Sequence, residues 1–282
     1  VDFSSNTALS TATLTGLTPN TTYYARVKAR NYQGIDSAYL TLPSTVTLTN
    51  IPTASAFTGV TTSSLTANVG ANSNPSGTTY IFELDDDSAF GSVNATSNTV
   101  LVNGGFTSLI ANTTYFVRVK ARNFLGTDSA YLSAMSTATL ATAPVTLAST
   151  FTVVNITSMS VAWAQNGNPQ GTSFIAELSL NSDYSTVDFS SNTALSTATL
   201  TGLAPNTTYY ARVKARNYQG IDSAYLTLTS TVTLTNIPTT AAFTGVTTSS
   251  LTANVGANSN PTGTTYIFEL DDDSAFGSVN AT

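Results

Sequence analysis

The sequence predicts an all-β protein in which similar β-sandwiches follow one another along the chain. Serine and threonine, 34 and 54 of the 282 residues, fill the polar positions, and Thr, Val and Tyr favour strands. Apolar and polar residues alternate in short runs bounded by turns, and no segment keeps the 3.6-residue apolar period of a helix. The third observation is an internal repeat, which indicates an array rather than one large domain.

The repeat has two levels. Residues 1–96 and 187–282 align without gaps at an offset of 186 and differ at only five positions. A weaker repeat lies halfway, because Tyr23, Tyr115 and Tyr209 are 92 and 94 residues apart. The predicted domains are therefore the C-terminal half of a domain at 1–50, complete domains at 51–143 and 144–237, and the N-terminal half of a domain at 238–282.

Each unit consists of short apolar-polar runs separated by turn residues. Strands are expected where Val, Leu, Tyr or Phe alternate with Thr, Ser or charged residues, and turns where Asn, Pro and Gly gather. The expected strands are 63–69, 78–84, 11–17, 22–29 and 37–48, and the expected turns are 74–77 and 31–34.

Residues 17–37 resemble the E–F–G region of a fibronectin type III domain. The family's pattern falls on Leu17, Pro19, Thr21, Tyr23, Val27, Ala29, Asn31, Gly34 and Ser37, and Trp163 matches the core tryptophan of strand B. The resemblance covers the whole chain as tandem copies, of the kind found in bacterial cell-surface or extracellular fibre proteins. It implies immunoglobulin-like sandwiches in a linear array, with Tyr23 making the tyrosine-corner hydrogen bond.

The chain departs from this pattern in the sandwich core. Val69 and Val255 stand where the family has its strand B tryptophan. The resemblance then implies smaller cores in these units, with Tyr, Phe and Leu from other strands filling the space.

All nine basic residues lie in three copies of one strand. Alternate strand residues face opposite sides, so Tyr23, Ala25, Val27 and Ala29 are expected to point into the sandwich. Tyr24 and the basic residues then form an outward face. The basic residues are Arg26, Lys28, Arg30, Arg118, Lys120, Arg122, Arg212, Lys214 and Arg216.

Three interpretations of this basic face differ in what the charges meet. The favoured one follows from the resemblance, which places strand C beside strand F, so that Glu83 pairs with Arg118, Lys120 or Arg122 and each such pair contributes roughly 0.2–1 kcal/mol. In the second, the face binds acidic groups of another chain or an anionic glycan. Nucleic acid is the least favoured partner, because acidic residues outnumber basic ones 15 to 9.

Six Asn-x-Thr sequons are possible N-glycosylation sites. Three of them share one turn, before the basic strand, which is expected to be exposed. The alternative is chance occurrence in a chain rich in Asn and Thr. The six are Asn20, Asn94, Asn112, Asn155, Asn206 and Asn280.

The acidic run at 85–90, repeated at 271–276, raises the question of a calcium site. It lacks the alternate spacing and the glycine of a calcium loop, so a solvated turn is the preferred interpretation. With no histidine or cysteine in the chain, we expect no metal site, no cofactor and no catalytic residue. No apolar run approaches the length of a membrane span.

Val1, Val93, Val187 and Val279 occupy one position in mid-domain, so each end of the sequence is expected to be half a sandwich. A half sandwich has an uncovered core and unpaired strand edges, which are templates for another chain. Either the sequence is a window onto a longer array, or halves of successive chains complete each other head to tail.

These observations lead to two main hypotheses for an extracellular or cell-surface protein. The first is a structural subunit or segment of a fibre, filament or surface stalk, whose partner is another copy of the same chain, head to tail or laterally. The second is an adhesin or binding array that holds carbohydrate or a surface protein through the face from Tyr24 to Arg30. An enzyme is disfavoured, because every candidate surface is repeated along the chain.

Overall fold

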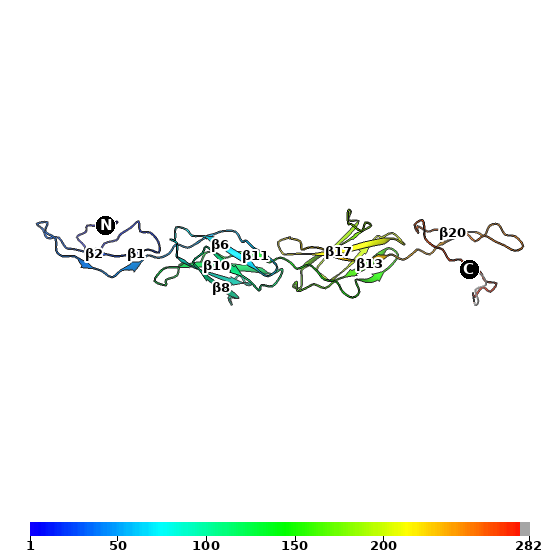
Figure 1. Cartoon of the computed structure of the whole chain (residues 1–282), viewed down its shortest axis with the longest axis horizontal. Coiled ribbons are helices and arrows are strands. Elements are labelled where there is room, and N and C mark those ends of the chain that lie inside the picture. The colour runs from blue at the N-terminus through cyan, green and yellow to red at the C-terminus, as the bar shows by residue number, and fades with distance from the viewer. Residues whose placement is uncertain (277–282) are drawn as a thin grey trace. The chain divides into compact units, whose positions relative to one another are not determined.

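The computed structural model describes residues 1–276, and every helix or strand assigned in that range is a β-strand, which confirms the all-β prediction. Within this range no helix has the length and hydropathy needed to cross a bilayer. The chain divides into two compact units, described separately below. Unit 1 holds Val1–Ala141 and the loop Asn217–Ile221, and unit 2 holds the remainder. Each unit contains one complete sandwich and one half sandwich (Figure 1).

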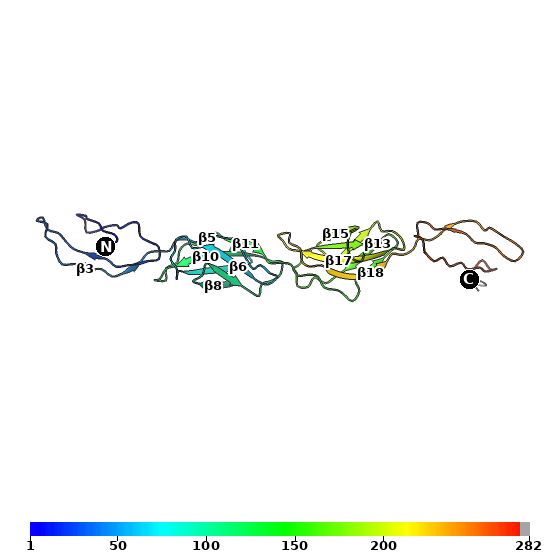
Figure 2. The ribbon, with the colours of Figure 1, turned by 45° about the horizontal axis from the view of Figure 1, so that its top comes forward.

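The sandwich of unit 1 is made of a three-stranded and a four-stranded antiparallel sheet (Figure 2). Its strands are β5 (Thr53–Ala54), β6 (Leu65–Gly70), β7 (Thr79–Asp85), β8 (Ala95–Thr99), β9 (Asn103–Phe106), β10 (Thr114–Arg122) and β11 (Met135–Ala138). One sheet has the order β5-β6-β9 and the other β11-β10-β7-β8. β10 alternates as predicted, burying Tyr115, Val117, Val119 and Ala121 between the sheets.

The sandwich of unit 2 repeats this topology. Its strands are β12 (Phe151–Val154), β13 (Ser158–Ala162), β14 (Ser173–Ser179), β15 (Phe189–Thr193), β16 (Thr197–Thr201), β17 (Thr208–Arg216) and β18 (Leu226–Val232). The sheet orders are β12-β13-β16 and β15-β14-β17-β18. Here too the alternation of the basic strand, β17, buries its apolar side and leaves the basic side chains on the outer face.

The two cores reach close packing with different side chains. In unit 2, Trp163 is buried and its ring lies 5.7 Å from that of Phe174. Unit 1 has Val69 in place of the tryptophan and is filled instead by Phe82, which is fully buried. The expectation that phenylalanine from another strand replaces the tryptophan is therefore confirmed. Phe82 fits because β9 carries Gly104 opposite it: a Cβ on Gly104 would lie 2.7 Å from Cγ of Phe82.

The tyrosine-corner bond is present in all three copies. The hydroxyl oxygen of Tyr115 accepts a hydrogen bond from the backbone N–H of Ile110 at 3.0 Å. Tyr209 accepts one from Ala204 at 2.9 Å, and Tyr23 one from the residue five positions before it, also at 2.9 Å. This bond ties the turn before the basic strand to the strand itself.

Residues 1–50, which we name the leading half, form only two-residue strands. These are β1 (Thr22–Tyr23), β2 (Arg26–Val27), β3 (Leu40–Thr41) and β4 (Thr45–Val46), paired as β1-β4 and β2-β3. The strand expected at 11–17 is not formed here, although its copy is β16. The inward-facing expectation is also wrong for Val27, which is 51% exposed, whereas the equivalent Val213 is fully buried. The reason is that no described segment supplies the opposing sheet or the strand that corresponds to β14, which lies beside β17 in the complete sandwich.

Residues 238–276, which we name the trailing half, are similarly incomplete. They contain only the strand pair β19 (Thr239–Thr240) and β20 (Val255–Gly256). Their copy in unit 1 supplies β5, β6 and β7, three well-formed strands. Strand formation in these segments therefore depends on the partner strands, as is usual for β-structure.

We predict that Gly104→Ala destabilises the unit 1 sandwich by about 1–3 kcal/mol, because the added methyl overlaps the ring of Phe82. Hydrogen-exchange mass spectrometry should show faster exchange in β9 and β10. The matched control is Gly105→Ala, since the nearest atom to that Cβ is 3.9 Å away. Equal effects of the two substitutions would contradict this account of the core.

Candidate interaction site

The outer face of each complete sandwich pairs the basic strand with an acidic neighbour. In unit 1, β10 lies antiparallel to β7 with Arg118 directly opposite Glu83, and their nitrogen and oxygen atoms are 2.7 Å apart. In unit 2, Arg212 and Glu177 repeat the register and the 2.7 Å distance. The favoured interpretation, a pair between Glu83 and its neighbouring strand, is confirmed for Arg118.

The other two basic residues of each strand bind an aspartate that the sequence reasoning missed. Lys120 and Arg122 approach Asp128, which follows the turn after β10, at 2.9 and 2.5 Å. In unit 2, Asp222 binds its lysine and arginine at 2.8 and 2.5 Å. The constant spacing of six residues from arginine to aspartate was the available signal, because a tight turn folds the aspartate back beside the strand.

Aromatic rings cover the arginine of each acidic pair. The guanidinium of Arg118 lies 4.4 Å from the ring centre of Phe90 and 4.3 Å from that of Tyr131. The Tyr131 hydroxyl also donates to Oε1 of Glu83 at 2.8 Å. In unit 2, Tyr184 and Tyr225 take the same two places. Such cation–π contacts favour Arg because its planar group stacks on rings.

These partners lower the pKa of the acidic side chains. The hydrogen bond from Arg122, reinforced by Lys120, lowers the pKa of Asp128 to about 2 against the cost of partial burial. The hydrogen bond from Arg216, with Lys214, does the same for the pKa of Asp222. Burial alone would raise the pKa of Glu83, but the hydrogen bonds from Tyr131 and Arg118 outweigh it and the net pKa is lowered. Every basic side chain of this face thus has an acidic partner within its own sandwich, and the lysine and the second arginine share one aspartate.

The leading half differs from the complete sandwiches, because only two of its three basic residues have an acidic partner in residues 1–276. Lys28 and Arg30 bind Asp36 as in the other copies. Arg26 stacks on Tyr39, 4.0 Å from the ring centre. Within residues 1–276, however, no glutamate pairs with Arg26. Glu269, which repeats Glu83 on the trailing half, has no basic partner in that range either.

The turn that carries three of the sequons is a contact point rather than an open surface. Asn20 adopts a left-handed φ of 46°, and its side chain is fully buried. Its Nδ2 donates to Oγ1 of Thr78 at 2.8 Å, and its Oδ1 accepts from the backbone N–H of Phe124 at 2.8 Å. Asn112 is likewise fully buried, and its Oδ1 accepts from the backbone N–H of Tyr218 at 2.8 Å.

The expectation that this turn is exposed is therefore wrong at Asn20 and Asn112. A glycan on either amide would displace the bonds just described. Asn206 is half-buried and donates to Oγ1 of Thr264 at 2.9 Å. Asn94 and Asn155 are exposed, so glycosylation stays a prediction there, and Asn280 lies outside the described residues.

The acidic turn after β7 is largely solvated, as the preferred interpretation expects, because residues 86–89 are exposed. Asp85 is buried, and its Oδ1 accepts from the backbone N–H of Asp87 at 3.2 Å. Asp86 accepts from Nδ2 of Asn94 at 2.9 Å. In the described part of the chain, no group of three or more acidic residues is arranged to hold a metal ion.

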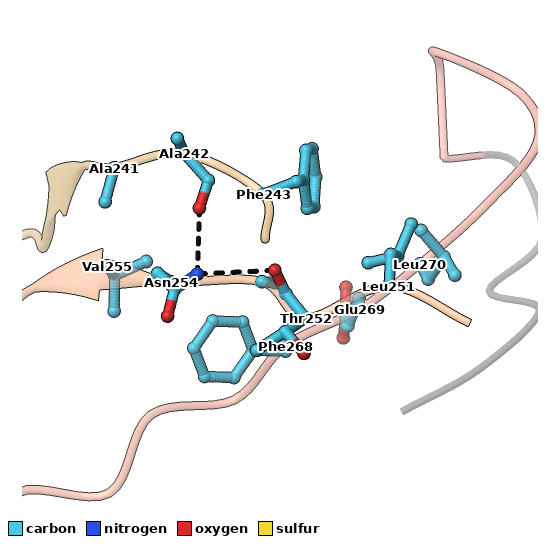
Figure 3. Close-up of a pocket in the computed structure, with 11 residues that line it drawn as sticks. Ala241, Ala242, Phe243, Leu251, Thr252, Asn254, Val255, Phe268, Glu269 and Leu270 are labelled. Atoms are coloured by element: carbon cyan, nitrogen blue, oxygen red, sulfur yellow. Dashed lines mark hydrogen bonds between the residues drawn. The ribbon is translucent and has the colours of Figure 1, made fainter. Parts of the chain in front are cut away.

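A groove opens on the trailing half, with a volume of about 540 Å³. Figure 3 shows its lining side chains on three stretches of the chain, at residues 241–243, 251–255 and 268–270. Across the bottom of the groove, Nδ2 of Asn254 donates to the backbone oxygens of Ala242 at 2.9 Å and Thr252 at 3.3 Å, and to Oγ1 of Thr244 at 2.9 Å. The lining includes Phe243, Leu251, Val255, Phe268, Glu269 and Leu270.

Comparison with known proteins gives a family match and many similar solved structures, of which two are described here. Residues 143–231 match the family described as fibronectin type III domain. The chain is similar to a two-domain fibronectin type III segment of chicken tenascin, with 12% identity and a TM-score of 0.42, over 66% of this chain and 100% of that one. It is also similar to the FN1–FN3 domains of chicken CNTN1, with 18% identity and a TM-score of 0.32, over 78% of this chain and 80% of that one. None of the curated proteins matches it.

We predict that Asp222→Asn removes part of the acid sensitivity of the unit 2 sandwich. The folded pKa lies below the ordinary value of 3.8, so the stabilisation is present above pH 4 and is lost as the pH falls towards 2. Denaturation followed by fluorescence of Trp163, the only tryptophan, should show a lower midpoint at pH 6 and a smaller fall between pH 4 and 2. Asp128→Asn is the matched control, because it alters the other sandwich and should leave this transition unchanged.

We also predict that Asn20→Ala loosens the leading half from the sandwich of unit 1 by about 1–3 kcal/mol, because the Phe124 N–H loses its acceptor. Alanine is in addition disfavoured at a positive φ. Hydrogen exchange at the Phe124 amide should accelerate at least tenfold. Asn94→Ala, at an exposed sequon, should leave that amide unchanged, and protection that survives Asn20→Ala would refute the contact.

Proposed function

We propose that this protein is a structural segment of an extracellular fibre, filament or surface stalk, because residues 143–231 match the fibronectin type III family and the rest of the chain repeats that unit in tandem. Proteins built from such arrays are commonly extracellular and commonly serve structural or adhesive roles. The exposed sequons Asn94 and Asn155 are compatible with that location.

The observation that carries the proposal is the internal pairing of the basic face. The basic face was the best candidate for a binding surface in the sequence, but its charges form ion pairs within each sandwich. The partners are Glu83 and Asp128 in unit 1 and the equivalent acids in unit 2. The same partners recur in both complete copies, so no copy is set apart as a specialised site. Repetition of one module whose charged groups pair internally is typical of a spacer or fibre.

The contacts of Asn20 add a second support. They join the turn of one repeat to two turns of the next, one before β7 through Thr78 and one after β10 through the Phe124 amide. Thr49 and Asn123 add two further bonds, to the backbone oxygens of Ala121 and Thr47. A binding array on flexible linkers has no need of such buried junctions, whereas a stalk benefits from the rigidity they supply.

The alternative is an adhesin or binding array that uses the same outer face. Arg122 favours it, because its side chain keeps 42% exposure despite the bond to Asp128. An anionic glycan could add a second partner to this guanidinium.

Two measurements on the protein and its source separate these functions. Antibodies raised against the purified chain should label fibres or stalks outside intact cells, and label confined to the cell interior would overturn the proposal. Binding to an array of anionic and neutral glycans should be absent. Saturable binding that Arg122→Gln weakens, without change in the Trp163 fluorescence transition, would instead establish the adhesin.

A further inference from the structure

All the charged residues of the unit 1 sandwich belong to one of its two sheets. Residues 51–143 contain eight of them, and each stands on β7, on β10 or in the turn that follows one of these strands. The other sheet, β5-β6-β9, carries none. The eight are Glu83, Asp85, Asp86, Asp87, Arg118, Lys120, Arg122 and Asp128. Any partner that recognises this sandwich by charge must therefore meet this sheet.

The charges have opposite signs at the two ends of the sheet. Because β10 runs antiparallel to β7, Arg122 lies beside the first residue of β7, whereas Asp85, the last residue of β7, lies near the start of β10. At the first end, Lys120 and Arg122 share the one negative charge of Asp128, which leaves a net charge of +1. At the other end, Asp85 and the next two residues carry three negative charges, and no salt bridge reaches them in the described part of the chain.

The middle of the outer face is neutral and aromatic. Here Arg118 is paired with Glu83 and stacks on the rings of Phe90 and Tyr131. Phe90 belongs to the acidic turn, so this stacking holds that turn over the outer face. Tyr131 remains 37% exposed. The order along the face is therefore negative, aromatic and positive.

The unit 2 sandwich has the same order with a different acidic turn. At its basic end, Lys214 and Arg216 share Asp222. At the other end, Asp183 and Asp188, both exposed, stand in place of the run of three aspartates. The polarity of the face is therefore present in both complete sandwiches, although the turn that supplies its negative end differs in sequence.

Resting on the proposed structural role, we infer that two copies of this chain associate side by side through the outer face of the unit 1 sandwich, turned end for end. In this arrangement Arg122 of each copy faces Asp86 of the other, and the two aromatic centres pack together. The contact is isologous, with a twofold axis through the middle of the face. Parallel docking in register would instead place like charges opposite each other.

The spacing and the free atoms of the two groups fit this contact. Arg122 stands four residues from Arg118, and Asp86 three residues from Glu83, which is about 13 and 10 Å along a strand. A twofold axis at the Arg118–Glu83 pair therefore brings Arg122 close to Asp86 of the other copy. Arg122 binds Asp128 through Nε and Nη2, which leaves Nη1 for a second carboxylate. The bond that Asp86 accepts from Asn94 uses Oδ1 alone.

The first experiment measures self-association of the 282-residue chain by sedimentation and mass photometry at about 0.05 M and about 0.5 M salt. We expect association at the lower concentration and a weaker one at the higher, because salt screens the pairs between Arg122 and Asp86. Copies with a net charge of −6 that merely repelled each other would show the opposite trend. Stronger association at the higher salt concentration would therefore overturn the docking.

The second experiment exchanges the two charges. Asp86→Lys should weaken association more than about tenfold, because the lysine then faces Arg122 of the other copy. The same substitution changes the net charge of the chain from −6 to −4, so general repulsion alone would predict tighter association. Arg122→Glu should also weaken association. The double variant Asp86→Lys/Arg122→Glu keeps the original net charge and should restore it.

The control places a charge on the uncharged sheet of the same sandwich. Asn103 is exposed on β9, and Asn103→Glu should leave association unchanged. Hydrogen exchange in β10 checks that the sandwich stays folded. Asp86 lies outside the strands, so Asp86→Lys should leave that exchange unchanged even if Arg122→Glu accelerates it through loss of the bond to Asp128.

The outcomes separate this inference from the proposed function. A chain that stays monomeric at every concentration overturns the docking, while antibody labelling of fibres or stalks outside cells still decides the structural role. Association that Asp86→Lys weakens and the double variant restores supports the docking. Association that Asp86→Lys strengthens, or that neither single substitution changes, overturns it.

Discussion

The antiparallel pairing of the basic strand with its acidic neighbour is the constraint on which each sandwich depends. In the pair of β10 with β7, placing Arg118 opposite Glu83 also places Val119 opposite Phe82, one charged pair outside and one apolar pair inside. A slip of one residue would exchange the two faces, exposing the valines and burying the arginines. Core and outer face therefore specify the same register, and the tyrosine corner holds the entry to the strand in place.

Two nearly identical segments of the chain show how far local sequence determines whether a strand forms. Residues 1–50 and 187–236 are nearly identical, yet only the second forms long strands. One local difference contributes: Pro43 interrupts the last strand of the leading half, where Thr229 allows β18 to continue, because proline cannot donate to the ladder. The larger cause is the missing opposing sheet, since these strands gain their stability from burial of one face.

The two complete sandwiches show that topology and core composition are separable. One core is built around Trp163 and small residues on the facing strands, and the other around Phe82 and Gly104. Each half of a domain is matched in volume to its own partner.

The sequence by itself determined the repeat and the alternation of the basic strand, and its resemblance to a known family predicted the tyrosine corner and a pair between Glu83 and the basic strand. All of these follow from short periods and from neighbours on adjacent strands. Only the tertiary structure decided which basic residue faces Glu83, that Asp128 binds the other two, and that the turn at Asn20 is buried. The burial of Asn20 depends on contacts between segments 58 to 104 residues apart, which no local pattern encodes.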